Sequence, residues 1–178
     1  MIFIISGTSG SGKTTLVNAL LADMPELTKV VTYTTRPQRE GEVDGKDYHF
    51  VSGEEFLNLL TTGKFAESAW VYDYCYGTPW MNKYEGDLVL ITDVQGFKTL
   101  TGNMPPEMYY SIFITSPAYE ERLVGRKTED EESLKRRLET AKEELEAAKH
   151  YDHVVVNEDF NWTLEELKSI VSGVMKCD

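Results

Sequence analysis

The fold class of this chain is indicated by its first residues, Ile2-Phe-Ile-Ile-Ser-Gly7-Thr-Ser-Gly-Ser-Gly12-Lys13-Thr14. Its apolar, β-branched beginning, Ile2–Ser6, predicts a short buried strand. The turn after it matches G-x-x-x-x-G-K-[ST] at every fixed position from Gly7 to Thr14. Residues 14–23 then have a helical pattern that ends before Pro25. A strand, a glycine-rich loop and a helix in this order predict a phosphate loop that binds a nucleoside triphosphate.

Each residue type in this loop has a chemical reason to be there. Glycines let backbone N–H groups curl around a phosphate, and the helix N-terminus adds partial positive charge. We expect Lys13 to neutralise the β- and γ-phosphates of ATP, and the Thr14 hydroxyl to bind the accompanying Mg²⁺. The expected ATP-binding set is Gly7, Thr8, Ser9, Gly10, Ser11, Gly12, Lys13, Thr14 and Thr15. A chance match in a Gly/Ser-rich turn is the less favoured interpretation, because the flanking strand and helix fit as well.

The rest of the chain alternates apolar strands with helices. Strands are predicted at Asp87–Thr92, Tyr109–Thr115 and His153–Val156, and residues 65–76 are expected to be extended. Thr163 with Glu166 resembles a capping box, which predicts the start of the last helix. This alternation predicts an α/β sandwich of the P-loop NTPase type with a mainly parallel central sheet. A length of 178 residues suits one domain with a small inserted lobe.

Composition and charge narrow the classes of function. A formal net charge of −12 argues against a nonspecific nucleic-acid binder, which needs a basic face. No signal peptide or membrane span is visible in the sequence. Cys75 and Cys177 fit no disulfide framework and no paired metal motif, so we expect a cytoplasmic protein. An acidic protein that binds anionic nucleotides must gather its 18 Lys and Arg residues locally.

The polar loop after residue 35 contains such a group of cations. Arg36 and Arg39 are three residues apart, and an acid and Tyr48 follow them. Two guanidinium groups can bind one monophosphate bidentately, and a tyrosine hydroxyl can add a further donor. A solvated charged loop with a structural tyrosine is the alternative, which we would favour if the phosphate loop were absent.

This segment closely resembles the guanylate kinase family, whose pattern here is T-T-R-x-x-R-x-G-E-x-x-G-x-x-Y-x-F. The resemblance extends over nearly the whole chain as an ordered series of short matches. These are Phe65-Ala-Glu67, Tyr76-Gly-Thr78, Asp93-Val-Gln-Gly96, Ser111-Ile-Phe-Ile114, Glu121-Arg122 to Arg126, and Tyr151-Asp-His-Val-Val-Val-Asn157. The resemblance implies a phosphotransferase that moves the γ-phosphoryl group of ATP to GMP or dGMP, with Mg²⁺.

The resemblance also implies roles for individual residues in the acceptor site. The GMP phosphate would be held by Arg36, Arg39, Tyr48 and Tyr76, and the guanine edge would be read by Thr32, Glu67, Thr78 and Asp93. The chemistry agrees, because guanine offers an N1–H and an amino group as donors to a carboxylate. Alternatively, Glu67 is a surface acid in a strand. The aromatic run at Trp70, Tyr72, Tyr74 and Tyr76 is interpreted mostly as a packed strand face, with Tyr76 the functional exception.

The resemblance also implies a mobile lid after the predicted strand Tyr109–Thr115. Arg122 and Arg126 are four residues apart and share one helix face. By resemblance they join Arg137 and Lys13 as catalytic cations on the transferred phosphates. The expected division is a core at 1–31, 87–121 and 143–178, a GMP-binding lobe at 32–86 and a lid at 122–142.

Two departures from the family pattern leave alternatives open. Ile91 stands where an acid near the metal is typical, and the link from Pro79 to Asp87 is shorter than usual, as if a helix were trimmed to a turn. One alternative is a kinase for another (deoxy)nucleoside monophosphate. The other is a catalytically weak guanylate-kinase-like protein-interaction module.

Overall fold

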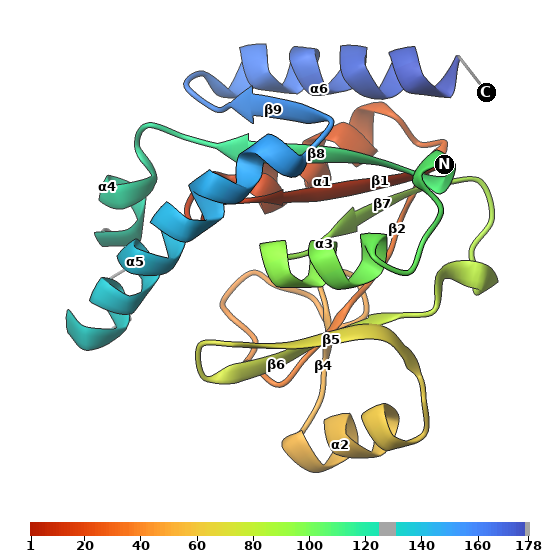
Figure 1. Ribbon diagram of the computed structural model, residues 1–178, viewed down its shortest axis with the longest axis vertical. Helices are drawn as coiled ribbons and strands as arrows, with labels where there is room; N and C mark the ends of the chain where they lie inside the picture. The colour runs from red at the N-terminus through yellow and green to blue at the C-terminus, as the bar shows by residue number, and fades with distance from the viewer. Residues whose placement is uncertain (125–130, 177–178) are drawn as a thin grey trace.

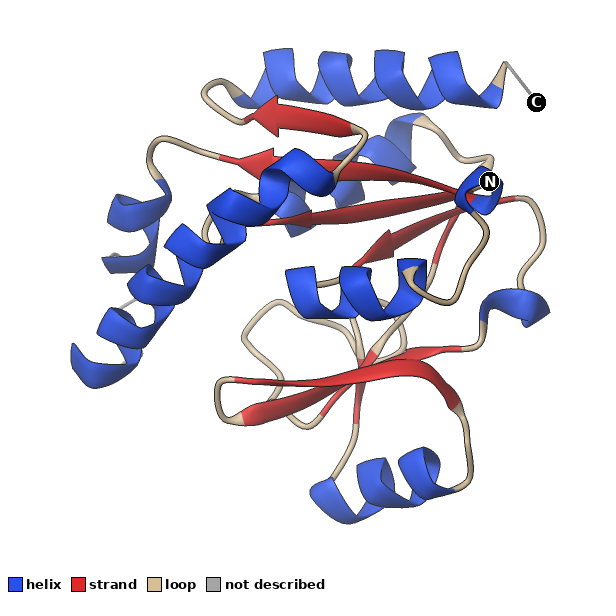
Figure 2. Cartoon of the chain, in the orientation of Figure 1, coloured by secondary structure: helices blue, strands red, loops and turns tan. Residues whose placement is uncertain are grey.

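The computed structural model describes residues 1–124 and 131–176, with side chains described outside residues 122–137. The chain folds around a five-stranded sheet whose order is β2-β7-β1-β8-β9. The strands are β1 (Ile2–Gly7), β2 (Leu27–Lys29), β7 (Asp87–Ile91), β8 (Tyr109–Thr115) and β9 (His153–Val156). All neighbouring strands are parallel. The predicted α/β fold with a parallel central sheet is confirmed (Figures 1 and 2).

Both faces of this sheet are covered, which explains why β1 is a continuous apolar run. Phe3 and Ile5 pack with α1 (Lys13–Asp23) and α6 (Phe160–Met175) on one face. Ile2 and Ile4 pack with α3 (Val94–Thr101) on the other. Alternate side chains of a strand point to opposite faces, so a strand buried on both sides needs apolar residues at every position.

A second, four-stranded sheet forms a separate lobe in the order β4-β3-β6-β5. Its strands are β3 (Tyr33–Thr34), β4 (His49–Phe50), β5 (Phe65–Val71) and β6 (Tyr74–Pro79), with α2 (Gly53–Thr61) beside them. Helix α3 lies between the two sheets and contacts both β1 and β5 (Figure 2). The chain returns to the core through a link that contains one short 3-10 turn, η1 (Met81–Lys83).

Two of the remaining helices lie beside the carboxyl end of β8 (Figure 1). They are α4 (Tyr119–Val124) and α5 (Glu131–Ala147), while η2 (Pro106–Met108) precedes β8 and η3 (Ala148–His150) follows α5. Within the described residues, none of the helices combines the length and apolarity needed to span a lipid bilayer.

Two local predictions are wrong. The last helix begins at Phe160 with Asp159 as its N-cap, and Thr163 lies inside it. The Asp159 carboxylate accepts from the Trp162 N–H, and the Thr163 hydroxyl donates to the Asp159 carbonyl, so the aspartate caps the first turn four residues earlier than predicted.

The aromatic run is also not one packed strand face. It folds back as the β5–β6 hairpin, with the reversal at residues 72–73. Trp70 is 67% exposed, and Tyr72 has a φ of 54°, which belongs to a turn. A period of two continues on both arms of a hairpin, so the pattern alone did not reveal the turn.

Candidate active site

The phosphate loop follows β1 and opens α1, as the motif predicts. Gly10 and Gly12 have φ of 83° and 90°, which side chains rarely adopt, and Lys13 is the first residue of α1. The Lys13 ammonium donates to the carbonyls of Gly7 and Thr8 at 2.7 and 2.8 Å. Thr14 and Thr15 are exposed, whereas Thr8 and Ser11 are buried.

Two distant residues contact this loop. The Asn157 side chain, after β9, donates to the Ser11 carbonyl at 2.7 Å and is buried. The backbone carbonyl of Asn157 accepts from the Ser116 hydroxyl at 2.8 Å. On the other side, the Glu144 carboxylate of α5 accepts from the Ser9 N–H at 3.3 Å. The loop is therefore held from the ends of β8 and β9 and contacted by α5.

One cavity connects the phosphate loop with the second lobe. It is lined by Gly7, Ser9, Lys13, Thr32, Arg39, Tyr48, Glu67, Val71, Tyr72, Tyr76, Gly77, Thr78, Ile91, Thr92, Asp93 and Glu144. Seven of the eight residues expected at the acceptor site are in this set, and Arg36 is the exception. A group bound to the phosphate loop and one bound by the lobe would thus share a single cavity.

Glu67 is the buried acid at the lobe end of the cavity. The Thr78 hydroxyl donates to its Oε1 at 2.5 Å, and its Oε2 is buried with no hydrogen-bond partner among the described residues. Burial raises the pKa of Glu67 to about 7; the Thr78 hydrogen bond opposes this rise and the Asp93 carboxylate adds to it. Asp93 itself caps α3 by accepting from the Gly96 N–H at 2.8 Å. The surface-acid interpretation of Glu67 is wrong, since the residue is 6% exposed.

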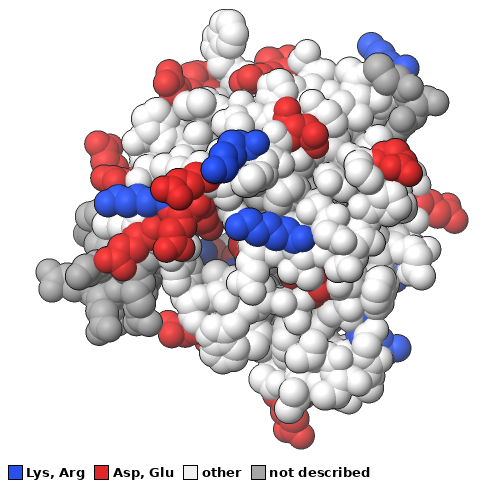
Figure 3. Space-filling model, in the orientation of Figure 1, with Lys and Arg blue, Asp and Glu red and all other residues white. Residues whose placement is uncertain are grey.

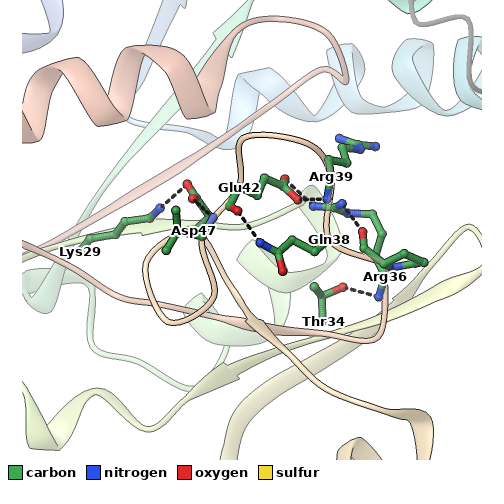
Figure 4. Close-up of polar contacts among 9 residues, drawn as sticks. Lys29, Thr34, Arg36, Gln38, Arg39, Glu42 and Asp47 are labelled. Atoms are coloured by element: carbon green, nitrogen blue, oxygen red, sulfur yellow. Dashed lines mark hydrogen bonds and ion pairs between the residues drawn. The ribbon is translucent and has the colours of Figure 1, made fainter.

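The two loop arginines have different surroundings (Figure 4). Arg36 is buried and donates to the Glu42 carboxylate at 2.7 Å and to the Pro37 carbonyl at 2.7 Å. Its guanidinium also lies 5.5 Å from the centre of the Tyr48 ring. Arg39 is exposed and lines the cavity, and its backbone N–H donates to Glu42 at 2.8 Å. Glu42 thus binds the side chain of Arg36 and the backbone of Arg39, and so fixes the two arginines relative to each other.

The tyrosines of the expected phosphate clamp lie close together. The rings of Tyr48 and Tyr76 are 6.0 Å apart, edge to face, and both line the cavity. Burial raises the pKa of Tyr48 to about 12, with further effects from Tyr76 and Arg36, so its hydroxyl keeps its proton and can donate to a phosphate.

The residues that could serve a metal ion are few. Ile91 lines the cavity beside Thr92 and Asp93, so an apolar side chain stands at the end of β7. No described group of three or more His, Cys, Asp or Glu side chains could hold a metal. Mg²⁺ keeps several waters and is commonly held by one or two protein oxygens plus substrate phosphates. The exposed Thr14 hydroxyl fits that use, and a full protein cage is not required.

The lid arginines are only partly described. Arg126 lies outside the described residues. Arg122 is on α4 and Arg137 on α5, and their side chains are likewise outside the described part. Their catalytic role stays a prediction.

The comparisons with known proteins agree with this geometry. The family described as guanylate kinase matches residues 1–173. The chain belongs to the guanylate kinase family. The guanylate kinase of Geobacter metallireducens is 41% identical over 179 residues, covering 96% of this chain and 87% of that protein. The guanylate kinase of Neisseria meningitidis serogroup A is 43% identical over 184 residues, covering 97% and 87%.

Solved structures give the same result. The crystal structure of guanylate kinase from Anaplasma phagocytophilum matches with a TM-score of 0.78 and 33% identity, covering 97% of this chain and 85% of that chain. This chain therefore shares the guanylate kinase fold as well as the family sequence.

Within this guanylate kinase framework, two residues at the loop had no assigned role in the sequence interpretation. Asn157 was noted only as the last residue of the matching segment that begins at Tyr151. Glu144 was not singled out at all, although a signal existed. It lies three residues after Ala141 and four before Ala148, and so falls on the inward stripe of its helix. A charged residue on such a stripe indicates a partner other than the apolar core.

Proposed function

We propose that this chain transfers the γ-phosphoryl group of ATP to GMP or dGMP, giving ADP and GDP or dGDP. The observation that carries the proposal is the single cavity that contains Lys13 and Ser9 at one end and Glu67 and Thr78 at the other. A kinase of this type must hold donor and acceptor phosphates together and exclude water. Membership of the guanylate kinase family supports the choice of substrates.

At the donor end, the phosphate loop would hold the ATP phosphates through its backbone N–H groups and Lys13. Lys13 would turn its ammonium from the Gly7 and Thr8 carbonyls toward phosphate oxygens. Thr14 would offer its hydroxyl to Mg²⁺, which when bound supplies neutralising charge on the phosphates. Arg122, Arg126 and Arg137 would add cations to the same group, and the segment 122–142 would form a lid.

At the acceptor end, the second lobe (residues 32–86) would bind GMP. Glu67 would accept from the two donors on the guanine edge, with Thr78, Thr32 and Asp93 alongside. Arg39, Tyr48 and Tyr76 would bind the monophosphate, and Arg36 would support them through Glu42. Phosphoryl transfer needs mainly positioning and charge neutralisation, which these groups supply. A cytoplasmic setting, where ATP is available, belongs to the same proposal.

A coupled assay across nucleoside monophosphates tests the proposal. With ATP and Mg²⁺, ADP release should be fast with GMP and dGMP and much slower with AMP, CMP and UMP. Equal rates with AMP and GMP would contradict the proposed acceptor. No transfer to any monophosphate, in a protein that still binds GMP, would indicate an interaction module instead.

A further inference from the structure

Glu144 lies where the phosphate loop would hold an anion. Its carboxylate accepts from the Ser9 N–H at 3.3 Å and lines the same cavity as Gly7, Ser9 and Lys13. The residue is on α5, 135 positions further along the chain than Ser9. A carboxylate has only acceptor oxygens, as a phosphate does, and the loop N–H groups and Lys13 are donors.

We propose that Glu144 acts as an internal anion that occupies part of the phosphate-binding site in the free enzyme, and that the ATP phosphates displace it. This inference rests on the proposed use of the phosphate loop for ATP. A residue of α5 would then compete directly with ATP for the phosphate loop. Glu144 is thereby added to the donor site, beside the loop residues and the arginines.

The charges around Glu144 explain why it is held there and why it can leave. The positive charge of Lys13 and the N–H of Ser9 stabilise its ionised form, while burial and the Asp93 carboxylate oppose it. Burial is the largest of these effects, and it raises the pKa of Glu144 to about 7. The cost of burying the charge therefore offsets part of what this contact contributes. A triphosphate carries more charge and more acceptor oxygens, so it competes for the same donors.

Displacement has a consequence for the helix. Like charges within a few ångströms repel strongly where water is excluded, so Glu144 and a bound triphosphate cannot share the loop. If the adjacent part of α5 moves with the Glu144 side chain, the movement reaches α4, which α5 contacts. ATP binding would then be coupled to the position of the segment that carries Arg137.

The opposite role, in which Glu144 supports ATP binding, can be distinguished from displacement by experiment. If Glu144 instead held Lys13 and Ser9 in place for ATP, its loss would weaken ATP binding. If it is displaced by ATP, its loss removes a competitor and must strengthen binding.

The test compares Glu144→Gln and Glu144→Ala with the control Glu146→Gln. Glu146 is exposed on the same helix, and its change removes the same charge (acidic side chains over α5 are visible in Figure 3). Equilibrium binding of a non-hydrolysable ATP analogue with Mg²⁺ is measured by calorimetry. We expect both Glu144 variants to bind the analogue about fivefold tighter or more, with the control unchanged. GMP binding should stay unchanged in all three.

Unchanged or weaker analogue binding by folded Glu144→Gln would overturn the inference alone. Tighter binding by Glu146→Gln to the same extent would overturn it too, because the effect would then be general electrostatics. Failure of the wild-type protein to bind the analogue would overturn the donor site together with this inference. Thermal unfolding of each variant confirms that folded proteins are compared.

Discussion

The Thr78 hydroxyl donates to one oxygen of the Glu67 carboxylate at 2.5 Å, and the other oxygen is buried with no described hydrogen-bond partner. A buried unpaired acceptor costs free energy unless a ligand supplies a donor. The strand pair β5–β6 places both residues opposite each other, so the arrangement is built into the hairpin. Glu67 is thus prepared for a partner with two adjacent N–H donors, which guanine has in its N1–H and amino group and which adenine lacks.

Base selection should depend on this carboxylate. Glu67→Gln should erode the preference for GMP over AMP, because an amide presents one donor and one acceptor where the carboxylate presents two acceptors. We expect kcat/KM for GMP to fall at least about tenfold, or about 1.4 kcal/mol. The coupled assay measures this, and a variant with full GMP preference would show that Glu67 does not read the base.

Glu67 should also make stability depend on pH. Its pKa is raised from 4.5 to about 7 in the folded protein, so the folded state favours the protonated carboxyl. The stability associated with that proton is present in full below pH 4.5 and is lost as pH rises through 7. The free energy of unfolding of Glu67→Gln, relative to that of wild type, should therefore increase by on the order of 1–3 kcal/mol as pH rises from 5 to 8. Urea unfolding at both pH values checks this, and a difference independent of pH would contradict the assigned burial.

Lys13→Met should abolish transfer and leave the fold intact. The Lys13 ammonium donates to two loop carbonyls, outside the apolar core, and it is needed for the phosphates. We expect kcat to fall by far more than tenfold, which corresponds to more than about 1.4 kcal/mol of barrier. Lys64→Met, at an exposed position, is the control. Retention of over a tenth of wild-type turnover would remove Lys13 from its role.

Gly7→Ala should destabilise the core and the loop together. Gly7 has a φ of 148°, and a Cβ there would lie 1.8 Å from the Ile114 carbonyl oxygen of β8. The backbone must separate at that point, so we expect a loss of at least about 2 kcal/mol. Gly173→Ala is the matched control, because nothing lies within 4 Å of its Cβ and it is in helix α6. That variant should be slightly stabilised, by up to about 1 kcal/mol. Thermal and urea unfolding measure both.

Ile91→Asp should lower the Mg²⁺ concentration for half-maximal rate. The new carboxylate would lie in the cavity with Asp93 and Lys13, near the expected metal. Ile91 also packs partly against the core, so some stability should be lost. Ile91→Asn has a similar shape without the charge and should not lower the requirement. A Mg²⁺ titration decides, and an unchanged or raised requirement in Ile91→Asp would show that position 91 is not near the metal.

Local sequence was enough to predict the phosphate loop and the positions of four of the five core strands, β1, β7, β8 and β9. Residues 7–14 are adjacent in the chain, and glycine at positions 10 and 12 permits the left-handed conformations that the loop needs. The continuous apolar run of β1 predicts burial on both faces, as the sheet has it. The start of α6 and the turn at residues 72–73 were missed, because several nearby polar or aromatic residues fit the same local pattern.

The contacts that complete the site depend on tertiary structure. The motif predicts the same phosphate-binding role for Arg36 and Arg39. In the folded loop, Arg36 pairs with Glu42, and of these two arginines Arg39 alone lines the cavity. Glu144 and Asn157 reach the loop from 135 and 146 residues away. Such contacts follow from which strands are neighbours and how α5 lies against the sheet, and no local pattern encodes that. The chemistry of the phosphate loop follows from residues adjacent in the chain, whereas the side chains that meet the loop from a distance are brought there by folding.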